Sequence, residues 1–114
     1  MAELKENPTL KDLQEYIRLL CKERGWDQNN HLEIFLLFTE EVGELAKSIR
    51  QYADLYHEAG KSAQPFELEE EFADVLSYLL DLANYFDIDL EKALRKKEEI
   101  NKKREWKSGG EQQE

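Results

Sequence analysis

FTEEVGELAKSIR (residues 38–50) and ELEEEFADVLSYLLDLAN (residues 67–84) decide the fold of this chain. In both, apolar residues recur every three or four positions, which is the period of an amphipathic helix. Each segment also carries two acids spaced three apart, Glu41 with Glu44 and Glu71 with Asp74. Residues three apart share one face of a helix. If the two helices pack antiparallel, as the connecting segment permits, the four carboxylates converge on one spot.

Such a convergence has an electrostatic cost. Anions about 5 Å apart repel by roughly 3 kcal/mol per close pair at an effective dielectric near 20. The cluster therefore needs bound protons or a divalent cation, and oxygen-only ligands suit Mg²⁺ or Mn²⁺ better than zinc or copper. Magnesium typically arrives with a phosphate-bearing substrate. A solvated acidic face is the alternative that the residues alone leave open.

Composition sets the class of protein. The 114 residues, 40% of them apolar, suit one globular domain, and the net charge of −10 argues against a nucleic-acid polymer as partner. The single cysteine, Cys21, excludes an intrachain disulfide and favours a reducing compartment. No apolar run has the length of a membrane span or the form of a signal peptide. We therefore expect a cytoplasmic protein without a membrane partner.

Four helices are expected. Their approximate ranges are 9–24, 31 through at least 56, 65–86 and 90–106, with a Thr9–Asp12 capping box on the first and Asp87 or Asp89 capping the last. The third helix is apolar on most sides and should be the most buried. Short connections then predict an all-α four-helix bundle over residues 1–106. The tail, 107–114, has the composition of a disordered segment.

The last helix carries polar residues where its inward stripe should be apolar. Leu90 and Leu94 are followed at the same spacing by Lys97, Asn101 and Arg104. Such donors make charge-assisted hydrogen bonds to phosphate oxygens. The alternative is that the helix outruns the bundle and that its end is solvated.

The sequence resembles a known family over roughly Leu32–Trp106. EEVGELAKSIR, then EEEFADVLSYLLDLANYFDIDLEKAL, then KEEINKKREW resemble the MazG-like nucleoside triphosphate pyrophosphohydrolases, a branch of the all-α NTP pyrophosphatase superfamily. The family signature, ExxE followed by ExxD, is matched by Glu41, Glu44, Glu71 and Asp74. The resemblance implies that these four acids bind Mg²⁺, with Mn²⁺ as the alternative.

The resemblance also implies an activity, the hydrolysis of an NTP or dNTP to the monophosphate and pyrophosphate in nucleotide-pool housekeeping. Water would attack the α-phosphorus, and Glu41 would both bind metal and orient that water. Lys97, Asn101 and Arg104 match residues expected to contact phosphate. Asn84 is placed to reach the sugar or a metal-bound water, and Trp26 to stack on the base, although Trp26 could equally seal the end of the first helix.

The remaining expectations concern the oligomeric state and two alternatives to an enzymatic function. A second helix near 28 residues would be about 40 Å long, more than a small monomer readily covers, so we expect a homodimer or homotetramer. A non-catalytic nucleotide-binding module and a helical dimerisation module remain alternatives to the enzyme. A di-iron site of the ferritin type would use Glu-x-x-His twice, and neither His31 nor His57 supplies that pattern.

Overall fold

The computed structural model describes residues 1–53, 65–104, 107–108 and 111–112. Within them lie four helices, α1 (Leu10–Glu23), α2 (His31–Tyr52), α3 (Pro65–Tyr85) and α4 (Leu90–Lys102). The all-α prediction is confirmed. The segment predicted to be a disordered tail contains a two-residue antiparallel pair, β1 (Lys107–Ser108) with β2 (Glu111–Gln112). Since residues 109–110 and 113–114 lie outside the described part, disorder of the tail stays a prediction.

Side-chain caps define where three helices begin. The predicted capping box of α1 is present: the Thr9 hydroxyl accepts the Asp12 N–H at 3.1 Å, and Asp12 accepts the Thr9 N–H at 3.0 Å. Of the two candidates for α4, Asp89 is the cap, accepting the Lys92 N–H at 3.0 Å. A second capping box, Asn30 with Glu33, begins α2. This second box was not predicted, although Asn-x-x-Glu before an apolar run is a usual signature of a capping box.

Two helices end earlier than predicted. α2 ends at Tyr52 with Ala53 as its C-cap, short of the predicted end beyond Tyr56, and residues 54–64 lie outside the described part. α2 has 22 residues and α3 has 21, so the two helices are of nearly equal length. α4 ends at Lys102 rather than near residue 106. Helices depend on packing for much of their stability, and the end of α4 is a solvated basic run.

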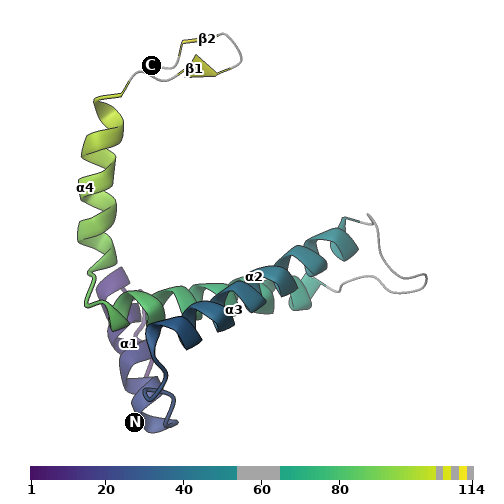
Figure 1. The fold of residues 1–114 in the computed structure, drawn as a ribbon, viewed down its shortest axis with the longest axis vertical. Coiled ribbons are helices and arrows are strands. Elements are labelled where there is room, and N and C mark those ends of the chain that lie inside the picture. Colours follow the sequence, from purple (N-terminus) through teal and green to yellow (C-terminus); the bar gives the residue numbers. More distant parts are fainter. Residues whose placement is uncertain (54–64, 105–106, 109–110, 113–114) are drawn as a thin grey trace.

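The helices are arranged as a hairpin with two attached arms (Figure 1). α2 and α3 lie side by side and antiparallel, α1 packs against α3, and α4 contacts chiefly α1 and runs away from the hairpin. The predicted four-helix bundle is therefore not closed within one chain. The radius of gyration, 17.8 Å, reflects this open arrangement, since a compact chain of this length has about 13 Å.

A small core joins α1 to α3. Ile17 and Cys21 of α1 pack on Leu80 of α3, which is 2% exposed. Beside them, the buried Gln14 side chain donates to the Asn84 side chain at 3.1 Å and to the Ile88 carbonyl at 2.8 Å, and accepts the Leu90 N–H at 3.0 Å. A buried amide with all these partners is fully used, so Gln14 fixes α1 against the turn between α3 and α4.

Much apolar surface stays open on the hairpin. α3 contacts both α1 and α2 and holds Leu80, at 2% exposed the most buried apolar side chain of the described residues, as expected of the most buried helix, but Phe72 is 56% exposed and Leu76 46% exposed. The reason is that α4 does not fold back over this face. On α2, Phe35 and Leu36 are likewise exposed. Despite this surface, no helix in the described ranges combines the length and the apolarity that crossing a bilayer demands.

Candidate metal centre and the adjoining cavities

Three carboxylates meet at the middle of the hairpin. Glu41 comes from the centre of α2, and Glu71 and Asp74 come from the first half of α3. Each offers one oxygen, and these oxygens all lie within 4.8 Å of one another. The i, i+3 spacing places the two α3 acids on one face, and antiparallel packing brings Glu41 opposite them. We call these three residues the acidic cluster.

Glu44 does not join this group in the described part of the chain. Its side chain is exposed on α2, one turn beyond Glu41. The i, i+3 spacing keeps Glu44 on the same side of α2 as Glu41, but its side chain extends to solvent and does not reach the other three carboxylates. Its negative charge nevertheless contributes to the raised pKa of Glu71.

Burial and mutual repulsion disfavour the ionised form of the carboxyl groups in the acidic cluster. Burial raises the pKa of Glu41, and a hydrogen bond with Asp74 and the negative charges of Asp74 and Glu71 raise it further. The pKa of Glu71 is raised by burial first and then by the charges of Asp74 and Glu44. The Oε2 atom of Glu71 is buried and has no hydrogen-bond partner within the described residues. A buried acceptor without a donor is costly.

These features fit a hard divalent cation. A cation would supply the missing partner of Glu71 Oε2 and offset the repulsion between the carboxylates. The donor set is entirely carboxylate oxygen, which matches the preference of magnesium, manganese or calcium and not that of softer metals. Glu41, Glu71 and Asp74 are the residues that would hold the ion.

The raised pKa values predict how pH and magnesium affect thermal stability. Since the folded pKa values of Glu41 and Glu71 lie above the unfolded value near 4.5, the folded state binds more protons in that window. The melting midpoint of the metal-free protein should therefore fall as pH rises from about 4.5 through the raised pKa values. Added Mg²⁺ should raise the midpoint more at about pH 7.5 than at about pH 5, because protons compete for the same oxygens. Differential scanning fluorimetry checks this, and an equal magnesium effect at both pH values would contradict it.

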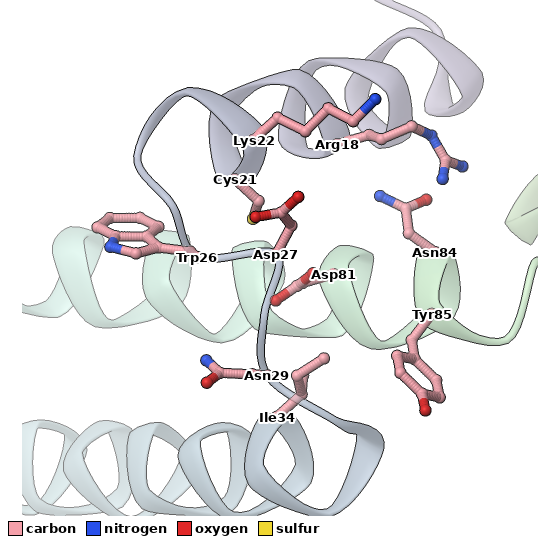
Figure 2. A pocket seen from close by; sticks show the side chains of 10 residues that line it. All are labelled: Arg18, Cys21, Lys22, Trp26, Asp27, Asn29, Ile34, Asp81, Asn84 and Tyr85. Carbon is pink, nitrogen blue, oxygen red and sulfur yellow. The ribbon is translucent and has the colours of Figure 1, made fainter.

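Two cavities lie between α1 and α3, and one of them reaches the acidic cluster. The first cavity, of about 260 Å³, is shown in Figure 2: the Cys21, Asp27 and Asp81 side chains lie at its centre, with Trp26 at one end and Asn84 and Tyr85 at the other. The second cavity, of about 220 Å³, reaches Asp74 of the acidic cluster and is also lined by Tyr78. Cys21, Trp26 and Asp81 line both cavities.

Trp26 and Asn84 lie near these cavities, as expected for nucleotide contacts, but both have structural partners. Trp26 is half exposed in the connection between α1 and α2, and the Arg24 guanidinium carbon is 4.9 Å from the centre of its ring. Asn84 lines the first cavity, yet its side chain is hydrogen bonded to Gln14, accepting at 3.1 Å and donating to the Gln14 carbonyl at 2.9 Å. The Asn84 amide therefore already serves the packing of α1 on α3.

The polar residues of the last helix lie away from the acidic cluster. Lys97 and Asn101 are on α4, and Arg104 follows its end. α4 runs away from the hairpin (Figure 1) and contacts chiefly α1. The structure therefore does not bring Lys97, Asn101 or Arg104 to the carboxylates of the same chain.

Tyr78 and Asp81 were not proposed as nucleotide contacts from the sequence. Burial and the charges of Glu41 and Asp74 raise the pKa of Tyr78, which therefore stays a neutral phenol beside the acids. Asp74, Tyr78 and Asp81 follow one another at spacings of four and three. That periodicity was a visible signal that all three share a face of α3.

The fold and the site together define an all-α protein whose helical hairpin carries a cluster of carboxylates with a donor set that suits a hard cation. The profile of the MazG nucleotide pyrophosphohydrolase domain family matches residues 29–107. The chain belongs to this family.

Relatives and solved structures agree with that assignment. Rat dCTP pyrophosphatase 1 is 37% identical over 102 residues, which cover 85% of this chain and 59% of the relative, so the chain spans little more than half of that protein's length. The putative pyrophosphatase YPJD from Bacillus subtilis superposes with a TM-score of 0.72 at 30% identity, covering 88% of this chain and 99% of that one. A Bacillus-conserved MazG protein, described as a nucleotide pyrophosphohydrolase, superposes with a TM-score of 0.66 at 28% identity, covering 94% and 100%.

Proposed function

We propose that this protein hydrolyses a nucleoside or deoxynucleoside triphosphate to the monophosphate and pyrophosphate, with Mg²⁺ or Mn²⁺ as cofactor. The observation that carries the proposal is the buried, unpartnered Oε2 of Glu71 within the acidic cluster. Membership of the MazG family and the similarity to proteins named dCTP pyrophosphatase support the choice of reaction.

The chain's own residues account for binding and proton transfer. Glu41, Glu71 and Asp74 would hold the cation, and Glu44, one turn along α2, would complete the set if its side chain turns inward. When bound, the ion would neutralise charge on the phosphates and lower the pKa of water. Glu41 would orient a water molecule against the α-phosphorus and take its proton as the new P–O bond forms. The bond to the bridging oxygen then breaks, and pyrophosphate leaves.

The nucleoside would extend from the acidic cluster into the second cavity. This cavity touches Asp74 and continues past Tyr78 to Trp26. The half-exposed indole of Trp26 would stack on the base. Asn84 lines the first cavity and stays a candidate contact for the sugar. To bind the sugar, its side chain would have to give up its hydrogen bonds to Gln14.

We further propose that the protein is a homodimer or homotetramer in which α4 of one copy lies along the hairpin of another. Both surfaces expose large apolar residues, Phe72 and Leu76 on the hairpin and Leu94 and Ile100 on α4. Their charges are complementary, since α4 is rich in lysine and arginine and α3 in glutamate. This arrangement would bring Lys97, Asn101 and Arg104 to bound phosphates. Light scattering should give a multiple of the 13.5 kDa chain mass, and a monomer at micromolar concentration would rule the arrangement out.

The activity is tested on a panel of nucleoside and deoxynucleoside triphosphates with Mg²⁺, with products identified by phosphorus NMR. The expected products are the monophosphate and pyrophosphate, formed only with the cation present. Release of orthophosphate would place the chemistry at another phosphorus. Nucleotide that raises the melting midpoint without turnover would indicate a non-catalytic binding module. If nucleotide neither raises the melting midpoint nor is hydrolysed, a helical dimerisation module would be the remaining function.

A further inference from the structure

The second cavity runs along α3 from the acidic cluster to Asp81. Asp74, at one end, belongs to the cluster, and Tyr78 and Asp81 follow on the same face of the helix. Seven residues of α-helix span about 10 Å. This length is comparable to that of an extended nucleotide from its α-phosphate to the far edge of its base. A triphosphate bound at the acidic cluster would therefore place its base beside Asp81.

Asp81 presents an acceptor at that position. It lies between the two cavities and lines both. The Cys21 thiol lies close enough to this carboxylate to affect the pKa of both groups, and a thiol is a weak donor that leaves most of the carboxylate's lone pairs unused. Among residues 1–53 and 65–104, Asp81 has no ion-pair partner. A half-buried carboxylate without a cation would gain from a donor on a ligand.

The ionisation states of the pair agree with this role. Burial and the neighbouring carboxylate of Asp81 raise the pKa of Cys21 to about 11, so the thiol keeps its proton at neutral pH. Burial raises the pKa of Asp81 above its ordinary value, and the neighbouring Cys21 thiol offsets only part of that rise. The protonated thiol therefore lies beside Asp81 as a neutral, weak donor, and in its ionised form Asp81 offers a ligand only acceptor atoms.

Nucleobases divide into two groups, according to whether they carry an exocyclic amine that can donate a hydrogen bond to such an acceptor. Cytosine and adenine carry an exocyclic amine that donates hydrogen bonds, and guanine carries its donor amine on C2, with the O6 carbonyl at the position of the adenine amine. Thymine and uracil carry no exocyclic amine and present the O4 carbonyl at the position of the cytosine amine. An O4 acceptor facing a carboxylate would leave both groups without a donor. We propose that Asp81 is a specificity-determining residue that selects nucleoside triphosphates with an amino-bearing base over those of uracil and thymine. This inference rests on the proposed function for the placement of the triphosphate.

The substrates dCTP and dUTP form a matched pair for testing this contact. Their bases differ only in that cytosine carries an amine where uracil carries the O4 carbonyl, and in that uracil carries a proton on N3. The wild-type kcat/KM for dCTP should exceed that for dUTP by about 10- to 100-fold, the discrimination expected of one good base contact. In Asp81→Asn the ratio should collapse or invert, mainly through KM, because the amide N–H₂ can donate to O4. The exposed Asp87→Asn is the control and should keep the wild-type ratio.

The two proposals can fail separately. Binding of non-hydrolysable dCTP and dUTP analogues, measured by calorimetry with Mg²⁺, reports base preference without turnover. Analogue binding with an Asp81-dependent preference but no hydrolysis would refute the activity alone. Turnover with the same dCTP-to-dUTP ratio in wild type and Asp81→Asn, or with equal losses on both substrates, would refute the role of Asp81. If Asp81→Asn does not fold, the wild-type panel decides, since a preference for dUTP or dTTP over all amino-bearing substrates also refutes it.

Discussion

Glu71→Gln is expected to abolish the release of pyrophosphate while leaving the fold intact. Glutamine keeps the shape of the side chain but removes the charge from a buried carboxylate oxygen that has no hydrogen-bond partner among the described residues. Activity should fall by about 10²- to 10³-fold, the range found when one preorganised electrostatic contact to a reacting group is lost. A coupled pyrophosphate assay at saturating Mg²⁺ measures the loss.

The control for this variant is Glu69→Gln. Glu69 lies two residues away on α3 and its side chain is exposed, so its removal changes net charge equally without touching the acidic cluster. It should retain wild-type activity within a few-fold. Glu71→Gln should also raise the metal-free melting midpoint, because it removes repulsion from the acidic cluster. Wild-type activity in Glu71→Gln would exclude the cluster as the catalytic centre.

Leu80→Ala is expected to cost about 2–5 kcal/mol of unfolding free energy, the usual penalty for truncating a fully buried leucine. Leu80 is 2% exposed and packs against Ile17 and Cys21. It lies one residue from Asp81, so loosening it should also widen both cavities and weaken nucleotide binding. Urea unfolding followed by circular dichroism measures the loss of stability.

Leu19→Ala is the matched control for this substitution. Leu19 lies on α1 and is 43% exposed, so its truncation creates no closed cavity in the chain. Its cost should stay below that of Leu80→Ala by at least about 1 kcal/mol. Equal costs for the two variants would show that α1 does not pack on α3 as described.

Local features of the fold could be predicted from the sequence. The Thr9–Asp12 capping box and the start of α3 at Pro65 were predictable because they depend on residues adjacent in the chain. Tertiary features could not. The end of α2 at Tyr52 differs from the prediction because its apolar period continues beyond the helix, and a repeating pattern does not show where the partner helix ends.

The open arrangement of the helices likewise could not be predicted from the sequence. An apolar stripe shows that a helix face must be covered but not whether the same chain or a second copy covers it. For this reason Phe72 and Leu76 were predicted to be buried, yet they are exposed in the single chain. The same limit applies to Lys97 and Arg104, because α4 runs away from the hairpin that carries the acidic cluster (Figure 1), and the sequence does not show this direction.

The candidate site was predicted in part. The i, i+3 spacing and the short connection were enough to bring Glu41, Glu71 and Asp74 together. The rotation of α2 about its own axis was not fixed by the pattern, so Glu44 could not be distinguished from Glu41. The contribution of Asp81 depends on α1 packing over α3, which places Cys21 beside it. No local pattern reports such a long-range contact.

Anomalous diffraction from a crystal grown with Mn²⁺ and a non-hydrolysable dCTP analogue tests the central claim most directly. We predict a manganese peak bound by oxygens of Glu41, Glu71 and Asp74 and by the phosphates of the analogue. Manganese bound elsewhere, with these three carboxylates turned to solvent, would contradict the account.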